Sequence, residues 1–248
     1  MFNSAPASIV RLAALMQSAR RTVVFTGAGM STESGLPDFR SEGGLWKQNR
    51  RFEELASLSA LRDEYREFVE FYRFRLRTLA RSKPNRGHQV LASLQRRGLI
   101  AALITQNVDG YHEQAGSEGV LNLHGRLERI HCQRCEAEAP LAAFLSGSEP
   151  VCASCSGKLR PSLVLFGESL DSRVLGEAFQ VSAQADLFLV LGSSLLVSPA
   201  NSLPKIAVDR GATLVIVNRE PTQYGALATL DLRASIGETL SAVEHELG

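Results

Sequence analysis

Five short apolar runs, rich in leucine and β-branched residues, recur along the chain and do not alternate with polar residues. They cover residues 22–26, 99–105, 163–166, 187–191 and 213–217. Strands that are apolar on both faces must be covered on both faces, which is typical of parallel sheets. Helical patterns separate most of these runs, at about residues 172–183, 199–209 and 237–247. We therefore predict an α/β fold with a Rossmann-like, doubly wound parallel sheet.

Two segments interrupt this alternation of apolar runs and helical patterns. Residues 53–81 are arginine-rich and helix-forming, and residues 127–160 contain all four cysteines. We predict that residues 41–87 and 126–160 form a smaller inserted domain, a helical insert plus a zinc ribbon. The remaining segments, 1–40, 88–125 and 161–248, would form the larger dinucleotide-binding domain. Glycine, proline and serine concentrate at the expected hinges, which are Ser41–Gly44, Pro84–Gly87, Gly125 and the stretch around Gly157.

The charge balance and the apolar runs exclude several classes of protein. Lysine and arginine number 27 and aspartate and glutamate 26, a net charge of +1 that gives no reason to expect nucleic acid or anionic membrane as a partner. No apolar run is long enough to span a bilayer, and residues 1–21 lack the apolar region of a secretory signal. We expect a cytoplasmic protein and leave its oligomeric state open, with a monomer as one option.

The four cysteines form two Cys-x-x-Cys pairs, Cys132 with Cys135 and Cys152 with Cys155. Two disulfides are the alternative, but a chain without an export signal is expected to keep its thiols reduced. A spacing of 16 residues between the pairs is typical of a four-cysteine zinc ribbon. Four thiolates fill a tetrahedral site, so we predict one structural zinc ion.

The first apolar run leads directly into Gly27-Ala28-Gly29-Met30-Ser31. Glycines after a parallel strand let backbone N–H groups approach a pyrophosphate. The match to the dinucleotide pattern is imperfect because Thr32 takes the place of the last glycine, and a plain tight turn is the alternative. Asp38, Phe39 and Arg40 follow, and a solvated loop would explain the two charged residues but not the aromatic one between them.

Further polar residues follow the other runs. Gln106, Asn107 and Asp109 follow one strand and suit ribose hydroxyls or a water, although a helix N-cap would account for Asp109 alone. His124 follows a short strand at residues 120–123 and suits a general base near neutral pH, although a lone histidine is more often structural.

The last two runs end in the same way. Gly192, Ser193 and Ser194 suit phosphate, and Asn218 and Glu220 suit ribose hydroxyls. Because the carboxyl ends of parallel strands meet at one edge of a sheet, we predict one extended ligand there.

Taken in order, these motifs resemble those of the sirtuins, the NAD-dependent protein lysine deacylases. The resemblance runs from about residue 22 to residue 240 and is greatest to compact bacterial and archaeal members. It rests on the motifs at residues 27–31, 34–40, 105–109, 123–125, 160–168, 192–194 and 218–220, together with the two cysteine pairs.

The resemblance implies NAD as co-substrate and acyl-lysine proteins or peptides as substrates, with release of nicotinamide and O-acyl-ADP-ribose. His124 would be the general base, and Asn107 and Asp109 would orient ribose and water. The NAD-binding set would be Gly27, Ala28, Gly29, Ser31, Thr32, Asp38, Phe39, Arg40, Gln106, Asn107, Asp109, His124, Gly192, Ser193, Ser194, Asn218, Glu220 and Ile236. The peptide and its acyl-lysine would contact Val164, Phe166, Gly167, Glu168 and Val197.

Tyr72 and Arg75 resemble the Tyr-x-x-Arg pair of sirtuins that remove succinyl, malonyl or glutaryl groups. Their spacing puts both on one helix face, where a guanidinium beside a phenol can bind a carboxylate. Arginine is abundant on this helix, however, and Glu42 stands where enzymes of that kind tend to have alanine. We therefore expect acetyl removal first and leave succinyl or malonyl removal open.

Three other functions are alternatives to deacylation. Protein mono-ADP-ribosyl transfer begins by breaking the same glycosidic bond and is the main alternative. An NAD-linked oxidoreductase would explain the glycine-rich turn but not the four-cysteine zinc ribbon. A nucleic-acid-binding module would need a more basic surface than a net charge of +1 provides.

Overall fold

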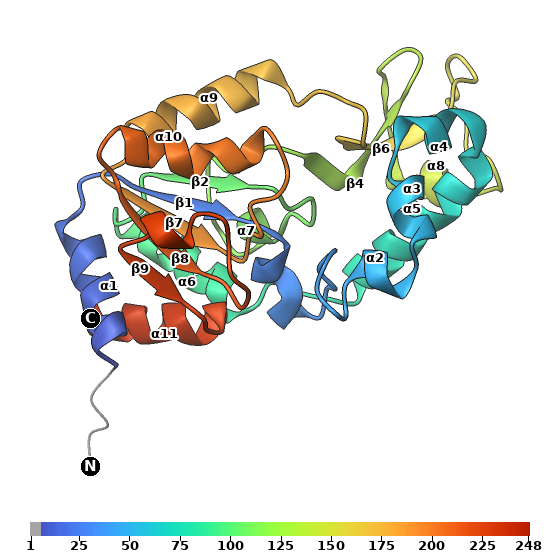
Figure 1. The fold of residues 1–248 in the computed structure, drawn as a ribbon. Helices are drawn as coiled ribbons and strands as arrows, with labels where there is room; N and C mark the ends of the chain where they lie inside the picture. Colours follow the sequence, from blue (N-terminus) through green and yellow to red (C-terminus); the bar gives the residue numbers. More distant parts are fainter. Residues whose placement is uncertain (1–5) are drawn as a thin grey trace.

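The computed structural model describes residues 6–248, and a parallel six-stranded sheet forms its larger part (Figure 1). The strand order is β3-β2-β1-β7-β8-β9, and every neighbouring pair is parallel. The strands are β1 (Thr22–Thr26), β2 (Ala102–Thr105), β3 (Leu121–Asn122), β7 (Leu187–Leu191), β8 (Thr213–Val217) and β9 (Leu230–Leu232). The α/β, doubly wound fold is confirmed, and β9 is a strand that the apolar runs did not predict.

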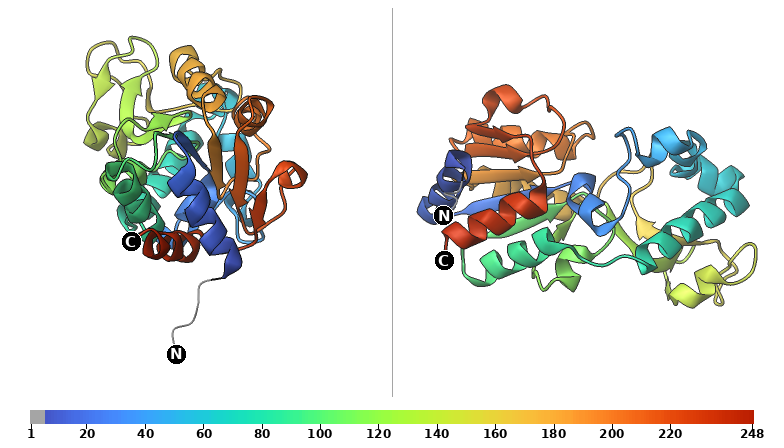
Figure 2. Two further views of the ribbon diagram at one scale, coloured as in Figure 1. Left: turned by 90° about the vertical axis from the view of Figure 1, so that its left-hand side faces the viewer. Right: turned by 90° about the horizontal axis from the view of Figure 1, so that it is seen from below.

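Helices cover both faces of this sheet, as the two-sided apolar strands require (Figure 2). Successive side chains of one strand point to opposite faces, so Val24 packs with α1, α6 and α11, whereas Val23 packs with α9 and α10. The covering helices are α1 (Ala7–Ser18), α6 (Arg86–Arg96) and α11 (Ile236–Glu246) on one face, and α9 (Ser172–Ala183) and α10 (Leu203–Asp209) on the other.

A second, antiparallel sheet contains β4 (Gly125–Cys132), β5 (Glu138–Ala139) and β6 (Leu159–Leu163), in the order β5-β4-β6. The prediction that residues 163–166 form a strand of the parallel sheet is therefore wrong. Leu163 and Leu165 are buried whereas Phe166 is 44% exposed, so the run is covered on one side only. Because the exposed residue is apolar as well, the alternation of buried and exposed positions is not visible in the sequence.

The first four α-helices between β1 and β2 belong with the antiparallel sheet. They are α2 (Leu45–Gln48), α3 (Arg51–Leu55), α4 (Leu58–Asp63) and α5 (Tyr65–Ala80). Phe68 and Tyr72 of α5 share one core with Ile130 of β4, Leu159 of β6 and Phe144 of the short helix α8 (Leu141–Leu145). The two inserted segments thus form one body beside the parallel sheet (Figure 1).

The division into two domains stays a prediction. Residues 1–5 of the predicted larger domain lie outside the residues that the structure describes. Three predicted boundaries fall inside elements: 87/88 inside α6, 125/126 inside β4 and 160/161 inside β6. The hinge predicted around Gly157 stays a prediction, although the glycine itself is closely packed. A Cβ at Gly157 would lie 2.8 Å from the Cys132 Sγ and 3.3 Å from the Cys155 Sγ, so this glycine packs inside the cysteine cluster.

The remaining elements are short. They are the 3₁₀ helices η1 (Ala28–Ser34), η2 (Ala200–Ser202) and η3 (Gly225–Leu227) and the helix α7 (Tyr111–Gln114). Across residues 6–248, no helix combines the length and the apolar character that crossing a membrane requires.

Candidate functional site

The carboxyl ends of the parallel strands meet at one edge, as predicted. Thr26 of β1 is in register with Thr105 of β2 and with Leu191 of β7, which is in turn aligned with Val217 of β8. The residues that follow these four positions therefore lie side by side. They border a cavity of about 650 Å³ between the parallel sheet and the smaller body.

Every residue predicted to bind NAD, peptide or acyl-lysine lines this cavity. On the NAD side these are Gly27, Ala28, Gly29, Ser31, Thr32, Asp38, Phe39, Arg40, Gln106, Asn107, Asp109, His124, Gly192, Ser193, Ser194, Asn218, Glu220 and Ile236. On the substrate side they are Tyr72, Arg75, Val164, Phe166, Gly167, Glu168 and Val197. The structure thus brings the predicted residues together, and their individual roles remain predictions.

The glycine-rich turn packs directly on the turn after β7. The Gly29 N–H donates to the Gly192 carbonyl at 2.8 Å, and a Cβ at Gly29 would lie 2.8 Å from the Gly192 Cα. Gly192 itself has φ +65°, which favours glycine. Side chains are excluded here, so main-chain groups form this part of the cavity wall.

A buried hydrogen-bond network joins the turn after β1 to the turn after β2. The Asn107 amide donates to the Gly27 carbonyl at 3.0 Å and to the Ser31 hydroxyl at 3.2 Å, and Ser31 donates to Asp109 at 2.7 Å. Burial raises the pKa of the Asp109 carboxyl, although hydrogen bonds from Tyr111 and Ser31 oppose the shift. Asp109 also accepts the Tyr111 N–H at the start of α7, so the helix-start interpretation holds in part.

His124 has one ring nitrogen engaged. Its Nδ1 lies 2.9 Å from the Gln106 carbonyl oxygen, and because a carbonyl only accepts, Nδ1 carries the hydrogen. The lone pair is then on Nε2. Burial lowers the pKa of His124 below 6.5, and the bond to Gln106 offsets part of the shift, so the imidazole is neutral at pH 7. These are the properties of a general base.

Several predicted residues are engaged with their neighbours. Asp38 accepts the backbone N–H groups of Arg40 and Ser41 at 3.1 and 3.0 Å and so shapes its own loop. Gln106 donates to the Ser193 hydroxyl at 2.7 Å. Phe39 stacks on Trp46, with ring centroids 4.9 Å apart, which is the packing role that a solvated loop could not explain.

Glu33 is a residue of this region that sequence reasoning missed. Its carboxylate accepts the Ser235 hydroxyl at 3.0 Å and the backbone N–H groups of Ile236 and Gly237 at 3.0 and 3.1 Å. Glu33 thereby links η1 to the start of α11, where Ile236 borders the cavity. No local pattern indicates a contact between residues about 200 positions apart.

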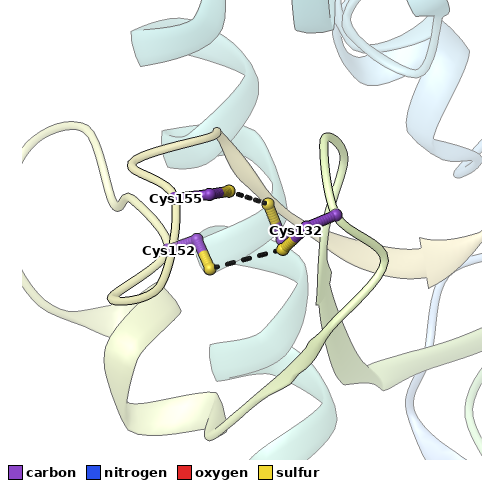
Figure 3. A group of neighbouring side chains, drawn as sticks. Cys132, Cys152 and Cys155 are labelled. Carbon is purple, nitrogen blue, oxygen red and sulfur yellow. Dashed lines mark hydrogen bonds between the residues drawn. The ribbon is translucent and has the colours of Figure 1, made fainter.

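The four cysteines form a compact cluster away from the cavity (Figure 3). Their Sγ atoms all lie within 4.8 Å of one another, with Cys132 to Cys155 at 3.5 Å and Cys135 to Cys152 at 3.8 Å. A tetrahedral zinc ion with bonds of about 2.3 Å places its sulfurs about 3.8 Å apart. The side chains are therefore placed to bind a structural metal ion, and the separations are too long for disulfides.

Comparisons with known proteins agree with this arrangement. The model of the Sir2 family matches residues 27–199. An NAD-dependent protein deacetylase 1 of Geobacillus kaustophilus is 51% identical over 236 residues, which cover 94% of this chain and 96% of that protein. An NAD-dependent protein deacylase of Aeropyrum pernix is 41% identical over 238 residues, covering 95% and 96%.

Solved structures are similar over the same extent. One described as Sir2 with a p53 peptide and NAD⁺ has a TM-score of 0.85 and 40% identity, covering 95% of this chain and 97% of that one. Another, described as Sir2 bound to acetylated peptide, has a TM-score of 0.85 and 37% identity, covering 96% and 98%.

Proposed function

This chain belongs to the Sir2 family, the sirtuins, and we propose from that membership and from its cavity that it is an NAD-dependent protein lysine deacylase acting chiefly on acetyl-lysine. The observation that carries the proposal is the meeting of His124, Asn107, Asp109 and the glycine-rich turn in one cavity. A base and a dinucleotide-type turn at the same sheet edge suit chemistry on the NAD ribose.

In the proposed reaction, NAD supplies the ribose carbon that accepts the acyl oxygen when nicotinamide leaves. His124 is suited to remove a proton from a ribose hydroxyl through Nε2, because Nδ1 is fixed on the Gln106 carbonyl. Asn107 and Asp109 are held by Ser31 and Gly27 and would orient ribose and water. Hydrogen bonds to protein groups hold both side chains in place, which favours a preorganised site.

We propose that the NAD-binding residues divide along the sheet edge. The Ala28 N–H and the hydroxyls of Ser193 and Ser194 would hold the phosphates. The Gly27 and Gly192 N–H groups donate to the Leu191 and Val217 carbonyls at 3.0 Å, so these glycines would contribute close approach of the main chain. Asn218, Glu220 and Ile236 lie at the β8 and α11 end and would hold the adenosine. Arg40 and Gln106 would flank the phosphate and ribose, and Phe39 would shield the nicotinamide side. The remaining members, Gly29, Ser31, Thr32 and Asp38, would shape the turns around them.

Substrate peptide would enter from the side of the smaller body. Val164, Phe166, Gly167, Glu168 and Val197 border the cavity there, and Phe166 is exposed. We propose that the peptide adds as a strand between the 166–168 segment and the 195–197 segment, where main-chain pairing gives affinity with little demand on sequence.

Tyr72 and Arg75 line the same cavity and would influence which acyl groups the site accepts. The Arg75 guanidinium lies 5.4 Å from the Phe39 ring centroid and 5.9 Å from that of Tyr72. Across residues 6–248 it forms no ion pair, and burial lowers its pKa. Glu42, by contrast, is 92% exposed, pairs with Lys47 and does not border the cavity. We propose that Arg75 can accept an acidic acyl chain as a secondary substrate.

Mass spectrometry of acetyl-, succinyl- and butyryl-lysine peptides, incubated with and without NAD, tests the proposal. We expect NAD-dependent loss of acetyl with equimolar nicotinamide and O-acyl-ADP-ribose. ADP-ribose label on protein, with the acyl group left on lysine, would indicate the transferase alternative. Reduction of NAD without nicotinamide release would indicate an oxidoreductase.

A further inference from the structure

The segment from Leu163 to Glu168 crosses from the antiparallel sheet to the cavity mouth and is held by main-chain bonds on both sides. The Val164 N–H donates to the His124 carbonyl at 3.0 Å, and the Phe166 N–H donates to the Ala56 carbonyl at 2.9 Å. The Phe166 carbonyl accepts the Leu58 N–H at 3.1 Å. Within residues 6–248, the N–H and C=O of Gly167 have no such partner and remain available to a strand laid beside them.

The Glu168 carboxylate closes this segment on itself. It accepts the Leu165 N–H at 2.8 Å, while the Glu168 N–H donates to the Leu165 carbonyl at 3.0 Å. These two bonds form a tight loop around Phe166 and Gly167, where Gly167 has φ +95°. The carboxylate therefore points back into the segment and is occupied there.

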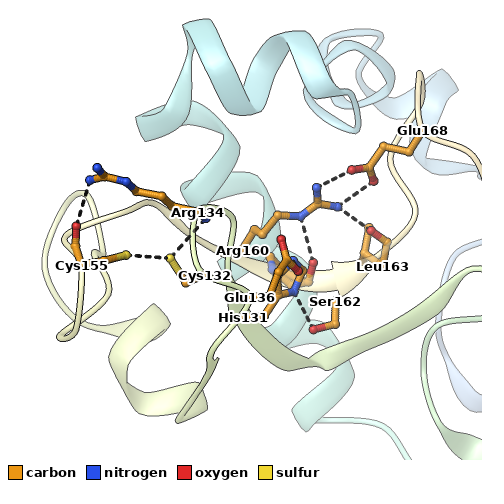
Figure 4. A network of polar contacts seen from close by, with 10 residues as sticks. His131, Cys132, Arg134, Glu136, Cys155, Arg160, Ser162, Leu163 and Glu168 are labelled. Atoms are coloured by element: carbon orange, nitrogen blue, oxygen red, sulfur yellow. Dashed lines mark hydrogen bonds and ion pairs between the residues drawn. The ribbon is translucent and has the colours of Figure 1, made fainter.

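Arg160 of β6 holds the same carboxylate from beneath (Figure 4). Its two terminal nitrogens donate to the two Glu168 oxygens at 2.6 and 2.8 Å, and one of them also donates to the Leu163 carbonyl at 2.6 Å. The Arg160 side chain is 5% exposed and that of Glu168 is 25% exposed. Bidentate pairs of this kind fix geometry as well as charge.

Because Arg160 pairs in register with His131 of β4, the loop is anchored to the rigid antiparallel sheet. A loop without that anchor would have to be ordered when a peptide binds, and the ordering would weaken binding. The Arg160 guanidinium and the Glu168 carboxylate neutralise each other, so neither is available to bind a ligand.

We propose that Arg160 and Glu168 are positioning residues that fix the free Gly167 edge in the shape that pairs with the substrate main chain. The carboxylate of Glu168 does not itself contact the peptide. This inference rests on the proposed deacylase function and assigns the ion pair, rather than any peptide side chain, as the determinant of peptide affinity at this edge.

The test compares an acetyl-lysine peptide that has flanking residues with a single acetyl-lysine that has none. In Glu168→Gln and in Arg160→Lys we expect the peptide KM to rise roughly 10-fold, since each loses the bidentate pair. The rise in the peptide KM should exceed any change in the kinetics on single acetyl-lysine, because the single amino acid has no flanking main chain to pair with Gly167.

Glu70→Gln is the matched control. It breaks another pair between a glutamate and a buried arginine, Arg73, in the same body, at 3.1 Å and away from the cavity. Its peptide KM should be unchanged. The double variant Arg160→Lys with Glu168→Gln should raise the KM by less than the product of the two single effects, since both act through one pair.

Equal losses on the peptide and on single acetyl-lysine would overturn the proposal, as would an unchanged peptide KM in soluble Glu168→Gln. An effect of Glu168→Gln that depends on the charge of the peptide, with none in Arg160→Lys, would show direct contact instead. If either variant is insoluble, anisotropy of a labelled peptide on the other decides the question. Absence of NAD-dependent deacylation by the wild type on both substrates would refute the proposed function itself.

Discussion

The cysteine cluster and the cavity both join residues that are far apart in the sequence, but different forces hold them. At the cluster, four thiol groups converge with few bonds to one another, and a cation is what makes their approach favourable. At the cavity, Asn107, Ser31 and Asp109 bond to one another and to the main chain. We therefore expect the cluster to depend on its ion for folding, whereas the side chains at the cavity are held by the protein's own hydrogen bonds.

Removing two thiolates should have the largest effect. Structural zinc contributes about 10–16 kcal/mol to folding in small metal-binding peptides, and the smaller body shares its core with the cluster. We expect Cys132→Ser with Cys135→Ser to lose zinc and to become poorly soluble before any kinetic change can be measured. Zinc content and near-ultraviolet circular dichroism are the measurements, and a folded, zinc-free, active double variant would contradict the comparison.

Removing the proposed base should affect turnover but not folding. We expect His124→Ala to lose about 10²–10⁴-fold in kcat, the usual share of general-base catalysis, with an unchanged melting temperature. His245→Ala, at an exposed histidine, is the control. Because burial lowers the pKa of His124, the acid limb of the wild-type kcat/KM profile should lie below pH 6.5. Near-normal turnover in His124→Ala would rule out the assignment.

Acid should weaken the parallel-sheet side through two buried histidines. Burial lowers the pKa of His88 from 6.5 to about 4 and that of His112 well below 6.5, and their rings are 4.8 Å apart. Between pH 6.5 and about 4 the unfolded chain binds protons that the folded chain does not, so stability falls as pH falls. The slope is about 1.4 kcal/mol per pH unit for each histidine.

Urea unfolding in excess zinc, at steps from pH 7.5 to 4.5, measures this loss apart from release of the metal. His88→Gln should have a shallower dependence on pH, by about one proton, and His245→Gln should match the wild type. A wild-type free energy of unfolding that stays flat down to pH 5 would contradict the prediction.

The smallest expected effect concerns the acyl group. Arg75→Ala should lower kcat/KM for succinyl-lysine roughly 10–100-fold and leave that for acetyl-lysine unchanged, because only the former has a carboxylate to lose. Arg77→Ala, at an exposed position on the same helix, is the control. Glu42→Ala should change neither, since that side chain is exposed and paired with Lys47. Wild type without measurable desuccinylation would make Arg75 an ordinary arginine of a basic helix.

The sequence predicted those parts of the molecule that local patterns determine. Apolar runs predicted β1, β7 and β8, cysteine spacing predicted the metal cluster, and the turns after the strands predicted the cavity residues. Local patterns do not show which strands pair with each other. The run at residues 163–166 has the composition of a buried strand, but only Leu163 is part of one, at the end of β6 in the antiparallel sheet.

Contacts over long sequence separations were also beyond prediction. Glu33 meets the start of α11 about 200 residues away. Arg160 and Glu168 are only eight residues apart, but their pairing depends on the turn of the chain after β6, which no local pattern indicates. A charged residue in a sequence does not indicate whether its partner is water, a ligand or another side chain.

The shared core of the smaller body has a consequence for how such a chain can evolve. Phe68 and Tyr72 come from the first inserted segment, and Ile130 and Leu159 from the second, so each covers apolar surface of the other. Deleting either segment would expose the partner's apolar residues to water. A shortened relative would therefore have to lose both segments together, and a chain cut in an exposed loop between them would remain one particle held by this core.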